Sequence, residues 1–520
     1  MTTAIKPREK MHVNPNATIG FVIYYPFQYY VYKNVYKELC DEAEFIVDLF
    51  QPLSRVDQKN LFEDIVNLLS REGVHYRVLQ RDDYFLASYL DTFFLKYRCL
   101  VSVWERGCMN IPATQDIRKV NLTYGSGKEL TMVRPSRGIF DVILAYGNRD
   151  AKLFSLFSNV EIVGNPKFDE WFSNDLYARI PPPEIRLDPM KKTLLYLPTH
   201  SDLSSVELLA EALGSLRGTY NVIVKLHYYM TREEPDRVQA LRQAGLSIVA
   251  DDIDLLPLLK VADVVVSDNS SAIFDAILAD KPVVVADFWD ESFLDATHKE
   301  VQIFQRGVQG AVTFSDSIEQ VIKRDGSVIS LQNVDDLRAK IELALEDREH
   351  YKRRRKELRE ELFVGMDGNA GLRAAQTIRR SVSDAALAKR PIMYHSIEAY
   401  KRRMGALSYG RERMLQKKIT ELEGVVSQAA LDEGSGVIFS IIFFADSSTV
   451  FDVALRALLE QSFPHERYEI FIVSMNGESL DFIQSSQLQT EIHVELIREE
   501  SVDVQFGMRV DRVLQKARGR

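Results

Sequence analysis

Residues 261–288, VADVVVSDNSSAIFDAILADKPVVVADF, determine the fold class of this chain. The run 264–266 is β-branched and suits a strand buried on both faces, and 283–285 is a second run of the same kind. Between them lie a turn of small polar residues at 267–271 and an apolar segment of helical length at 272–278. A strand, a turn, a helix and a second strand in this order predict a parallel β-α-β unit.

The turn of this unit, Ser267-Asp268-Asn269-Ser270-Ser271, carries no bulky side chain. Ser270 or Ser271 can cap the helix that follows, whose free N–H groups and positive dipole end attract anions. We therefore expect a phosphate-bearing ligand above the turn. The alternative is an ordinary capped helix of a doubly wound domain.

Short apolar strands alternate with helical segments along most of the chain. We expect strands at 19–24, 45–49, 76–79, 99–103 and 142–146, and again at 193–197, 221–226 and 246–249. A proline run at 181–183 separates residues 1–180 from residues 190–383. The pattern predicts two doubly wound α/β lobes in tandem, with a cleft between them.

Composition and charge narrow the class of protein. With 520 residues, 46% hydrophobic and 27% charged, the chain is of ordinary globular composition and too long for one core. Its formal net charge of -10 argues against nucleic acid as a partner, because duplex binding needs a broad basic face. The N-terminus is polar, and no stretch approaches the ~20 apolar residues of a membrane span. We expect a cytoplasmic protein, with peripheral contact to the inner face of the membrane left open.

Three cysteines, Cys40, Cys99 and Cys108, lack metal-ligand spacing. Their scarcity fits a reducing compartment, and we interpret all three as buried core residues.

Two later segments are strongly basic. The run HYKRRRKELREE at 350–361 is interpreted as a solvated helix face, with a membrane-surface role as the alternative. Residues 384–433 form a helical linker in which basic side chains and tyrosines gather at 389–418. This stretch is either a plain linker or a peripheral contact with membrane or acceptor.

Four motifs follow one another in a familiar order. They are Phe140-Asp141-Val142-Ile143, Gly164-Asn165-Pro166-Lys167-Phe168-Asp169, Val224-Lys225-Leu226-His227, and Ser267 to Ser271 followed by Phe274-Asp275. In this order they resemble the CDP-glycerol glycerophosphotransferases of teichoic acid synthesis, over residues 19–380. The resemblance implies two Rossmann-like lobes of GT-B type, with 1–180 on the acceptor side and 190–383 on the donor nucleotide side. It also implies a reaction without a bound metal or other cofactor.

The resemblance assigns residues to the donor phosphates. His227 matches the family histidine near these phosphates, and Ser270 and Ser271 match the paired hydroxyl residues that hold them. Lys225 and Asn269 lie beside them and are assigned to the same group. A donating or cationic imidazole would stabilise charge on a departing nucleotide. Without the resemblance, His227 is equally an ordinary histidine at the end of a strand.

On the acceptor side the chain departs from the family. Where the family has a His-Gly dipeptide with the expected base, this chain has Tyr124-Gly125-Ser126-Gly127-Lys128. Gly125, Ser126 and Lys128 would offer amides, a hydroxyl and an ammonium to an anion. Tyr124 takes the catalytic slot, but with an ordinary pKa of about 10 it is a poor base. His200, after the first strand of the second lobe, is the alternative base or phosphate ligand.

Other polar residues receive simpler assignments. Asn165 is expected to line the cleft, and Asp275 to fix its helix or a neighbouring loop. Asp251, Asp252 and Asp254 either contact the nucleotide base and ribose or cap the helix after them.

Residues 434–520 form a further α/β segment. Apolar strands at 437–444, 468–474 and 491–496 resemble the opening of a family 2 glycosyltransferase of GT-A type. The resemblance stops before that family's Asp-x-Asp metal motif. We therefore expect this partial domain to be inactive alone, and a divalent metal only in a complete GT-A domain.

One hypothesis and two alternatives follow. The hypothesis is a transferase that uses a nucleotide-activated donor, either a CDP-polyol phosphate or a nucleotide sugar, to build a cell-surface polysaccharide or glycopolymer. The acceptor would be a glycan, a lipid-linked group or a polyol. The first alternative is a catalytically inactive GT-B module that positions an attached GT-A enzyme. The second is a nucleotide-sugar 2-epimerase, which needs cleft acids and histidines that we do not find.

Overall fold

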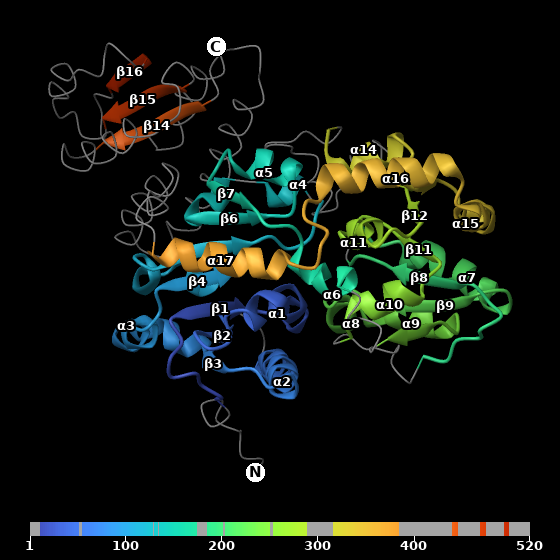
Figure 1. Ribbon diagram of the computed structural model, residues 1–520, viewed down its shortest axis with the longest axis horizontal. Coiled ribbons are helices and arrows are strands. Elements are labelled where there is room, and N and C mark those ends of the chain that lie inside the picture. The colour runs from blue at the N-terminus through green and yellow to red at the C-terminus, as the bar shows by residue number, and fades with distance from the viewer. Residues whose placement is uncertain are drawn as a thin grey trace. The chain divides into compact units, whose positions relative to one another are not determined.

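The computed structural model describes residues 11–50, 55–127, 129–133, 135–173, 185–200, 203–249, 253–288 and 316–383, and three strands at 439–445, 468–474 and 493–498. The chain divides into two compact units. Unit 1 comprises residues 1–128, 140–305 and 315–389 and holds both doubly wound lobes; unit 2 comprises 129–139, 306–314 and 390–520 (Figure 1).

The N-terminal lobe of unit 1 is built on a seven-stranded parallel sheet in the order β3-β2-β1-β4-β5-β6-β7. The strands are β1 (Ile19–Ile23), β2 (Ala43–Asp48), β3 (Tyr76–Leu79), β4 (Cys99–Ser102), β5 (Arg118–Leu122), β6 (Val142–Ala145) and β7 (Asn159–Ile162). Its longer helices are α1 (Tyr29–Lys37), α2 (Arg55–Arg71), α3 (Ala87–Phe94) and α5 (Asn148–Phe154). Every residue of β1 and β2 is buried, as expected of a sheet with helices on both faces.

The C-terminal lobe has a six-stranded parallel sheet in the order β10-β9-β8-β11-β12-β13. The strands are β8 (Thr193–Leu197), β9 (Asn221–Lys225), β10 (Ser247–Val249), β11 (Val264–Ser267), β12 (Val283–Ala286) and β13 (Ile329–Leu331). The helices are α7 (Val206–Ser215), α8 (Met230–Glu233), α9 (Pro235–Gln243), α10 (Leu255–Val261), α11 (Ala272–Leu278), α14 (Ile318–Arg324), α15 (Leu337–Glu346) and α16 (Glu349–Leu362).

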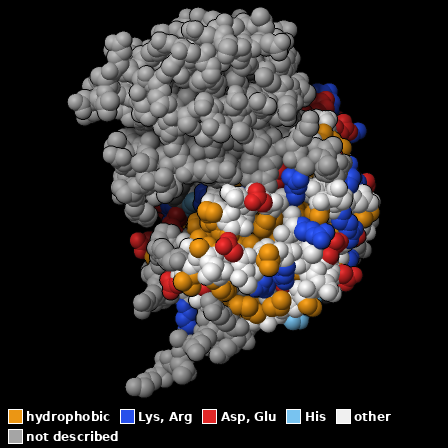
Figure 2. Space-filling view, turned by 90° about the vertical axis from the view of Figure 1, so that its left-hand side faces the viewer, with side chains coloured by type: hydrophobic (Ala, Val, Ile, Leu, Met, Phe, Trp, Pro, Cys, Tyr) orange, Lys and Arg blue, Asp and Glu red, His pale blue; other side chains and the backbone are white. Residues whose placement is uncertain are grey.

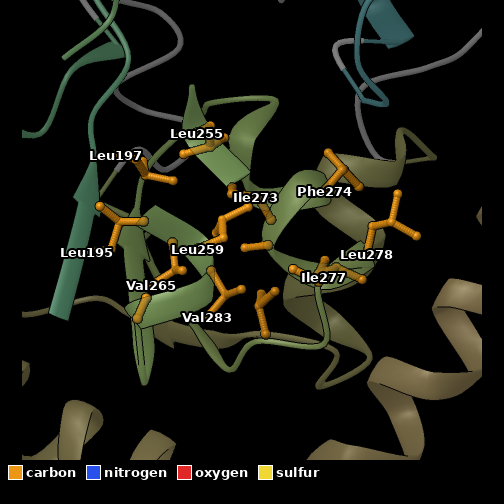
Figure 3. Packing of buried hydrophobic residues seen from close by; sticks show 14 of the residues in the cluster. Leu195, Leu197, Leu255, Leu259, Val265, Ile273, Phe274, Ile277, Leu278 and Val283 are labelled. Atoms are coloured by element: carbon orange, nitrogen blue, oxygen red, sulfur yellow. The ribbon is translucent and has the colours of Figure 1, made fainter. Parts of the chain in front are cut away.

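The β-α-β unit at 261–288 lies at the centre of the C-terminal lobe. Ile273, Phe274 and Ile277 of α11 pack with Leu259 of α10 and with Val265 of β11 in one hydrophobic cluster (Figure 3). All five side chains are almost completely buried. Burial of this apolar surface fixes α11, and with it the turn that precedes α11, above the sheet.

The chain returns to the N-terminal lobe in its last described helix of unit 1, α17 (Ala370–Ser383) (Figure 1). The carboxylate of Asp169, in α6 (Asp169–Phe172), accepts hydrogen bonds from the backbone N–H groups of Ala370 and Gly371, at 2.9 and 2.6 Å. Arg379 then pairs with Glu42 at 2.6 Å. The fold is therefore α/β, with two doubly wound lobes that are each built on a parallel sheet.

Three strands were not expected from the sequence, namely β5, β7 and β13. The expected strands 76–79 and 193–197 agree with the structure to the residue, and the others differ only at their ends. The proline run at 181–183 lies outside the described residues, and the predicted domain limits stay predictions.

One prediction about side chains is wrong, and another holds for most but not all of its residues. Cys40 is exposed, whereas Cys99 and Cys108 are buried. The basic run at 350–361 is not simply a solvated face, because Arg355 is buried and its guanidinium contacts Asp280 at 2.8 Å and Asp347 at 3.0 Å. These ion pairs fasten α16 to the C-terminal lobe.

Unit 2 includes α4 (Glu129–Met132) and a three-stranded parallel sheet of β14 (Phe439–Ala445), β15 (Tyr468–Ser474) and β16 (His493–Arg498). These strands confirm the three that were expected, while the GT-A assignment stays a prediction. The linker 384–433 lies outside the described residues, so its proposed membrane contact is untested.

On the described face drawn in Figure 2, acidic and basic side chains are interspersed among neutral ones. No helix within the described ranges is long and apolar enough to cross a membrane.

Candidate functional site

The turn between β11 and α11 is held by a buried carboxylate that the sequence did not single out. Asp268 is fully buried and accepts hydrogen bonds from the backbone N–H of Thr199 at 2.8 Å and from the N–H and hydroxyl of Ser205, both at 3.0 Å. Ser267 adds a hydroxyl bond to the Leu197 carbonyl at 2.7 Å. The loop after β8 is therefore tied to the turn after β11.

Ser270, Ser271 and Asn269 are half-buried in this turn. The Ser270 hydroxyl accepts a hydrogen bond from the Ala272 N–H at 3.3 Å. Ser271 occupies the cap position of α11 without a capping bond from its own side chain. Of the two serines expected as a cap, Ser270 makes the bond, and the Ser271 hydroxyl is not used for capping.

Two histidines lie together beside the turn. His227 and Lys225 are half-buried at the end of β9, and His200 is half-buried in the loop after β8. The ring centroids of His200 and His227 are 4.3 Å apart. The Tyr229 N–H donates to Nδ1 of His227 at 3.3 Å, so in a neutral ring Nε2 would carry the proton.

The loop after β5 meets the same turn from the N-terminal lobe. A Cβ placed on Gly125 would lie 3.4 Å from the side chain of Ser271. Gly127 has φ +78°, and a Cβ there would lie 2.1 Å from the ring of Phe274, so this position requires glycine. The Ser126 hydroxyl is buried and has no hydrogen-bond partner among the described residues. Lys128 lies outside the described residues.

Tyr124 is poorly suited to act as a base. Burial raises the pKa of Tyr124 well above its ordinary value, and the nearby Asp275 carboxylate raises it further. Its ring lies 5.4 Å from Phe27 and 6.2 Å from Trp104, between centroids. The geometry therefore favours Tyr124 as a hydroxyl donor and a packing ring.

Asn165 and Asp275 both make contacts with Lys167. The Asn165 side chain is buried and accepts a hydrogen bond from the Lys167 N–H at 3.2 Å. The Lys167 ammonium pairs with Asp275 at 2.6 Å. Asp275 is thus bonded to a neighbouring loop, as expected.

The described part of the acidic segment before α10 is a helix cap. Asp254 accepts a hydrogen bond from the Leu256 N–H at 3.2 Å and pairs with the Lys33 ammonium at 3.0 Å. Burial tends to raise the pKa of Asp254, but Lys33 and the cap bond outweigh it, so the pKa lies below its usual value. Asp251 and Asp252 lie outside the described residues.

Within the described ranges, no three His, Cys, Asp or Glu side chains gather as metal ligands would. Of the residues that the sequence assigned to the donor phosphates, Lys225 and His227 lie at the end of β9, and Asn269, Ser270 and Ser271 follow β11 of the same sheet. The loop of Tyr124 approaches Ser271 from the other lobe.

Comparison with known proteins connects this geometry to a family. Residues 151–294 match the family model of CDP-glycerol:poly(glycerophosphate) glycerophosphotransferases. This segment resembles a glycerophosphotransferase. It contains His200, Lys225, His227, Asn269, Ser270 and Ser271. The loop of Tyr124 lies outside it.

Similar proteins carry related descriptions. The teichoic acid glycerol-phosphate primase of Bacillus spizizenii is 28% identical over 221 residues, which cover 39% of this chain and 54% of the relative. The chain therefore matches about half the length of that curated relative. Both descriptions are of transferases and give no support to an inactive binding module.

Two solved structures are also similar to the glycerophosphotransferase-like chain. The wall teichoic acid polymerase TagF has 12% identity and a TM-score of 0.47, over 72% of this chain and 91% of that structure. A UDP-N-acetylglucosamine 2-epimerase has 12% identity and a TM-score of 0.47, over 71% of this chain and 96% of that structure.

Proposed function

We propose that unit 1 is a transferase that moves a glycerophosphate-type group from a CDP-linked donor to a hydroxyl of a growing cell-surface polymer. The observation that carries this proposal is the family match over residues 151–294, because it contains every described residue that the sequence assigned to the donor phosphates. Their position after β9 and β11 of one parallel sheet supports it.

The donor would lie above the C-terminal lobe. The Nε2–H of His227 would donate to a donor phosphate, and the hydroxyls of Ser270 and Ser271 would contact the same group. Donors aimed at developing charge accelerate such reactions most. Asp268 would act as a positioning residue, because it fastens the turn of Ser270 to the loop of His200.

In the proposed reaction the acceptor oxygen attacks the phosphorus of the transferred group. The new O–P bond forms as the bond to the cytidine monophosphate breaks, and the acceptor proton passes to His200. We assign the base to His200 because Tyr124 has a raised pKa and because His200 lies beside His227.

Release of cytidine monophosphate from CDP-glycerol tests the proposal, measured by phosphorus NMR with glycerol phosphate and methyl glycosides as acceptors. We expect His227→Ala to lower turnover by about a hundredfold or more, the loss typical of one lost transition-state donor. His350→Ala, at an exposed histidine on α16, is the matched control and should retain full turnover. Wild-type turnover in His227→Ala would show the mechanism to be wrong.

Release of uridine or guanosine nucleotides from nucleotide sugars, with none from CDP-glycerol, would instead indicate a glycosyltransferase. The match to the family model would then reflect the fold and the phosphate site alone.

A further inference from the structure

The segment that follows His227 contacts the N-terminal lobe through aromatic rings. Tyr25, after β1, is almost completely buried, and its ring centroid lies 5.4 Å from that of Tyr228 and 5.2 Å from that of Tyr229. Tyr229 in turn stacks on His227, with centroids 5.5 Å apart and an interplanar angle of 18°. Rings at these distances pack together, so a side chain of one lobe supports the histidine of the other.

An ion pair between the lobes holds the other end of the same segment. Asp64 of α2 accepts hydrogen bonds from the guanidinium of Arg232 in α8 at 2.5 Å and from the hydroxyl of Tyr228 at 3.4 Å. The guanidinium also lies over the ring of Tyr228, 3.6 Å from its centroid, and donates to the Tyr228 carbonyl at 3.2 Å. Asp64, Arg232 and Tyr228 form one cluster, which we call the bridging cluster.

The bridging cluster is more exposed than the pair of Lys33 and Asp254, which also joins the lobes. The side chains of Lys33 and Asp254 are each 6% exposed, whereas those of Arg232 and Asp64 are 34% and 39% exposed. Removal of one partner of a buried pair leaves an uncompensated charge, but a half-exposed pair contributes little to stability because water replaces the lost partner. The bridging cluster should therefore act on the position of the segment more than on the stability of the fold.

His227 is the residue whose position depends on this segment. Its Nδ1 accepts a hydrogen bond from the Tyr229 N–H at 3.3 Å, and its carbonyl accepts one from the Met230 N–H at 2.9 Å. Both bonds connect it to the segment that the bridging cluster holds. A shift of the segment would therefore turn the imidazole and move its Nε2 relative to a donor phosphate.

We propose that Asp64 is a positioning residue for His227, which acts across the lobes through Arg232 and Tyr228. This inference rests on the proposed function, since it concerns the donor contact of His227. A small displacement of such a group removes much of its catalytic effect, because its contact with the transition state depends on distance and direction. The donor half of the site is then complete only when α2 lies against α8.

NMR of the full chain with isotope-labelled histidine rings tests this positioning without turnover. His227→Ala identifies the resonance of His227 by its loss. We expect Asp64→Asn and Arg232→Gln each to shift or broaden that resonance. The two substitutions together should have no larger effect than either alone, because both break the same pair. Asp64→Glu keeps the charge and should retain most of the wild-type spectrum.

Steady-state kinetics with CDP-glycerol add a functional readout. Asp64→Asn should lower kcat by about tenfold with little change in KM, because the lost effect is on the transition state. Glu63→Gln is the matched control, since Glu63 is the neighbour of Asp64 on α2 but pairs with Lys59 of the same helix at 3.7 Å. It should change neither the His227 resonance nor kcat. Melting curves confirm that each variant is folded.

An unchanged His227 resonance in folded Asp64→Asn would overturn the proposal. An equal shift in Glu63→Gln would also overturn it, because the effect would then be one of general charge. So would a shifted resonance with wild-type kcat, because the position of His227 would then not matter for turnover. Absence of nucleotide release by the wild type would count against the proposed function, whereas the resonance would still decide whether Asp64 holds His227.

Discussion

The two lobes differ in how they build their halves of the site. In the C-terminal lobe, Asp268 fastens the small polar turn after β11 to the loop after β8, and His200 of that loop lies beside His227 after β9. In the N-terminal lobe, the ends of β1, β4 and β5 carry the large rings of Phe27, Trp104 and Tyr124. The first arrangement offers hydroxyls and N–H groups above the sheet, whereas the second fills the strand ends with aromatic side chains. The two lobes therefore share a fold but differ in the side chains at their strand ends.

Replacement of Asp268 by alanine should have the largest effect, because it releases the loop after β8 from the turn between β11 and α11. Three buried donors would lose their acceptor, which should cost about 3–5 kcal/mol of unfolding free energy and also abolish nucleotide binding. Urea denaturation and a nucleotide titration measure the two effects. Asp263→Ala, at the opposite end of β11, is the control. It should cost about 1 kcal/mol and leave nucleotide binding intact.

Gly127→Ala would disturb the place where the lobes meet. The Cβ of an alanine at this position would clash with Phe274, and the residue would have to keep a φ of +78°, which is strained for alanine. We therefore expect a loss of about 2–4 kcal/mol of unfolding free energy. Gly73 also has a positive φ, of +67°, but a Cβ added there would meet no atom within 4 Å. Gly73→Ala should therefore lose only about 1 kcal/mol of unfolding free energy. Equal losses in the two variants would show that strain alone, without the clash, sets the cost.

Two buried aspartates should give the lobes opposite pH dependence. In the N-terminal lobe, burial raises the pKa of Asp48 to about 6, against hydrogen bonds from Tyr84 and backbone N–H groups that lower it. The protonated Asp48 carboxyl stabilises the fold relative to the ionised one. This stability is fully present below the ordinary pKa of an aspartate and is lost as the pH rises through about 6, a change of roughly 2–3 kcal/mol in unfolding free energy. Asp254 of the C-terminal lobe has a lowered pKa, so its stabilisation is lost as the pH falls.

Urea denaturation between about pH 2 and pH 7, with Asp48→Asn and Asp254→Asn, separates the two contributions, because the Asp254 contribution changes only below its ordinary pKa of about 4. Relative to Asp48→Asn, the wild type should lose stability as the pH rises. Relative to Asp254→Asn, it should gain stability. The same sign for both would contradict the assigned environments.

Tyr124→Phe should have the smallest effect on turnover. Because the pKa of Tyr124 is raised, removal of its hydroxyl takes away a hydrogen bond but no base, and we expect a loss of less than about tenfold in kcat. Steady-state kinetics should compare this variant with His200→Ala, whose kcat should fall by about a hundredfold or more. A larger loss in Tyr124→Phe than in His200→Ala would reverse the assignment.

The sequence predicts the β-α-β unit of the C-terminal lobe better than the cluster of rings in the N-terminal lobe, for a physical reason. The β-α-β unit at 261–288 is contiguous, and its apolar periods and small polar turn report directly on its packing. The rings of Phe27, Trp104 and Tyr124 come from loops that lie far apart in the chain, so no local sequence pattern predicts their contact.

Two of the unexpected strands were missed because their local sequence does not show their packing. β5 was missed because Arg118, Lys119 and Asn121 interrupt its apolar pattern, although Lys119 and Asn121 are almost completely buried in the sheet. β7 was missed because it is an edge strand with no fully buried residue. Tertiary context overrides the local pattern in both strands.

The most direct test of the central claim, that the C-terminal lobe holds a cytidine-linked donor, is a thermal-shift comparison of CMP, CDP, UDP, GDP and CDP-glycerol on the wild type and on Ser271→Ala and His227→Ala. A ligand that binds only the folded chain raises its melting temperature. We predict shifts with the cytidine ligands that are largest for CDP-glycerol and are lost in both variants. Equal shifts with all nucleotides, or shifts that survive both substitutions, would contradict the account.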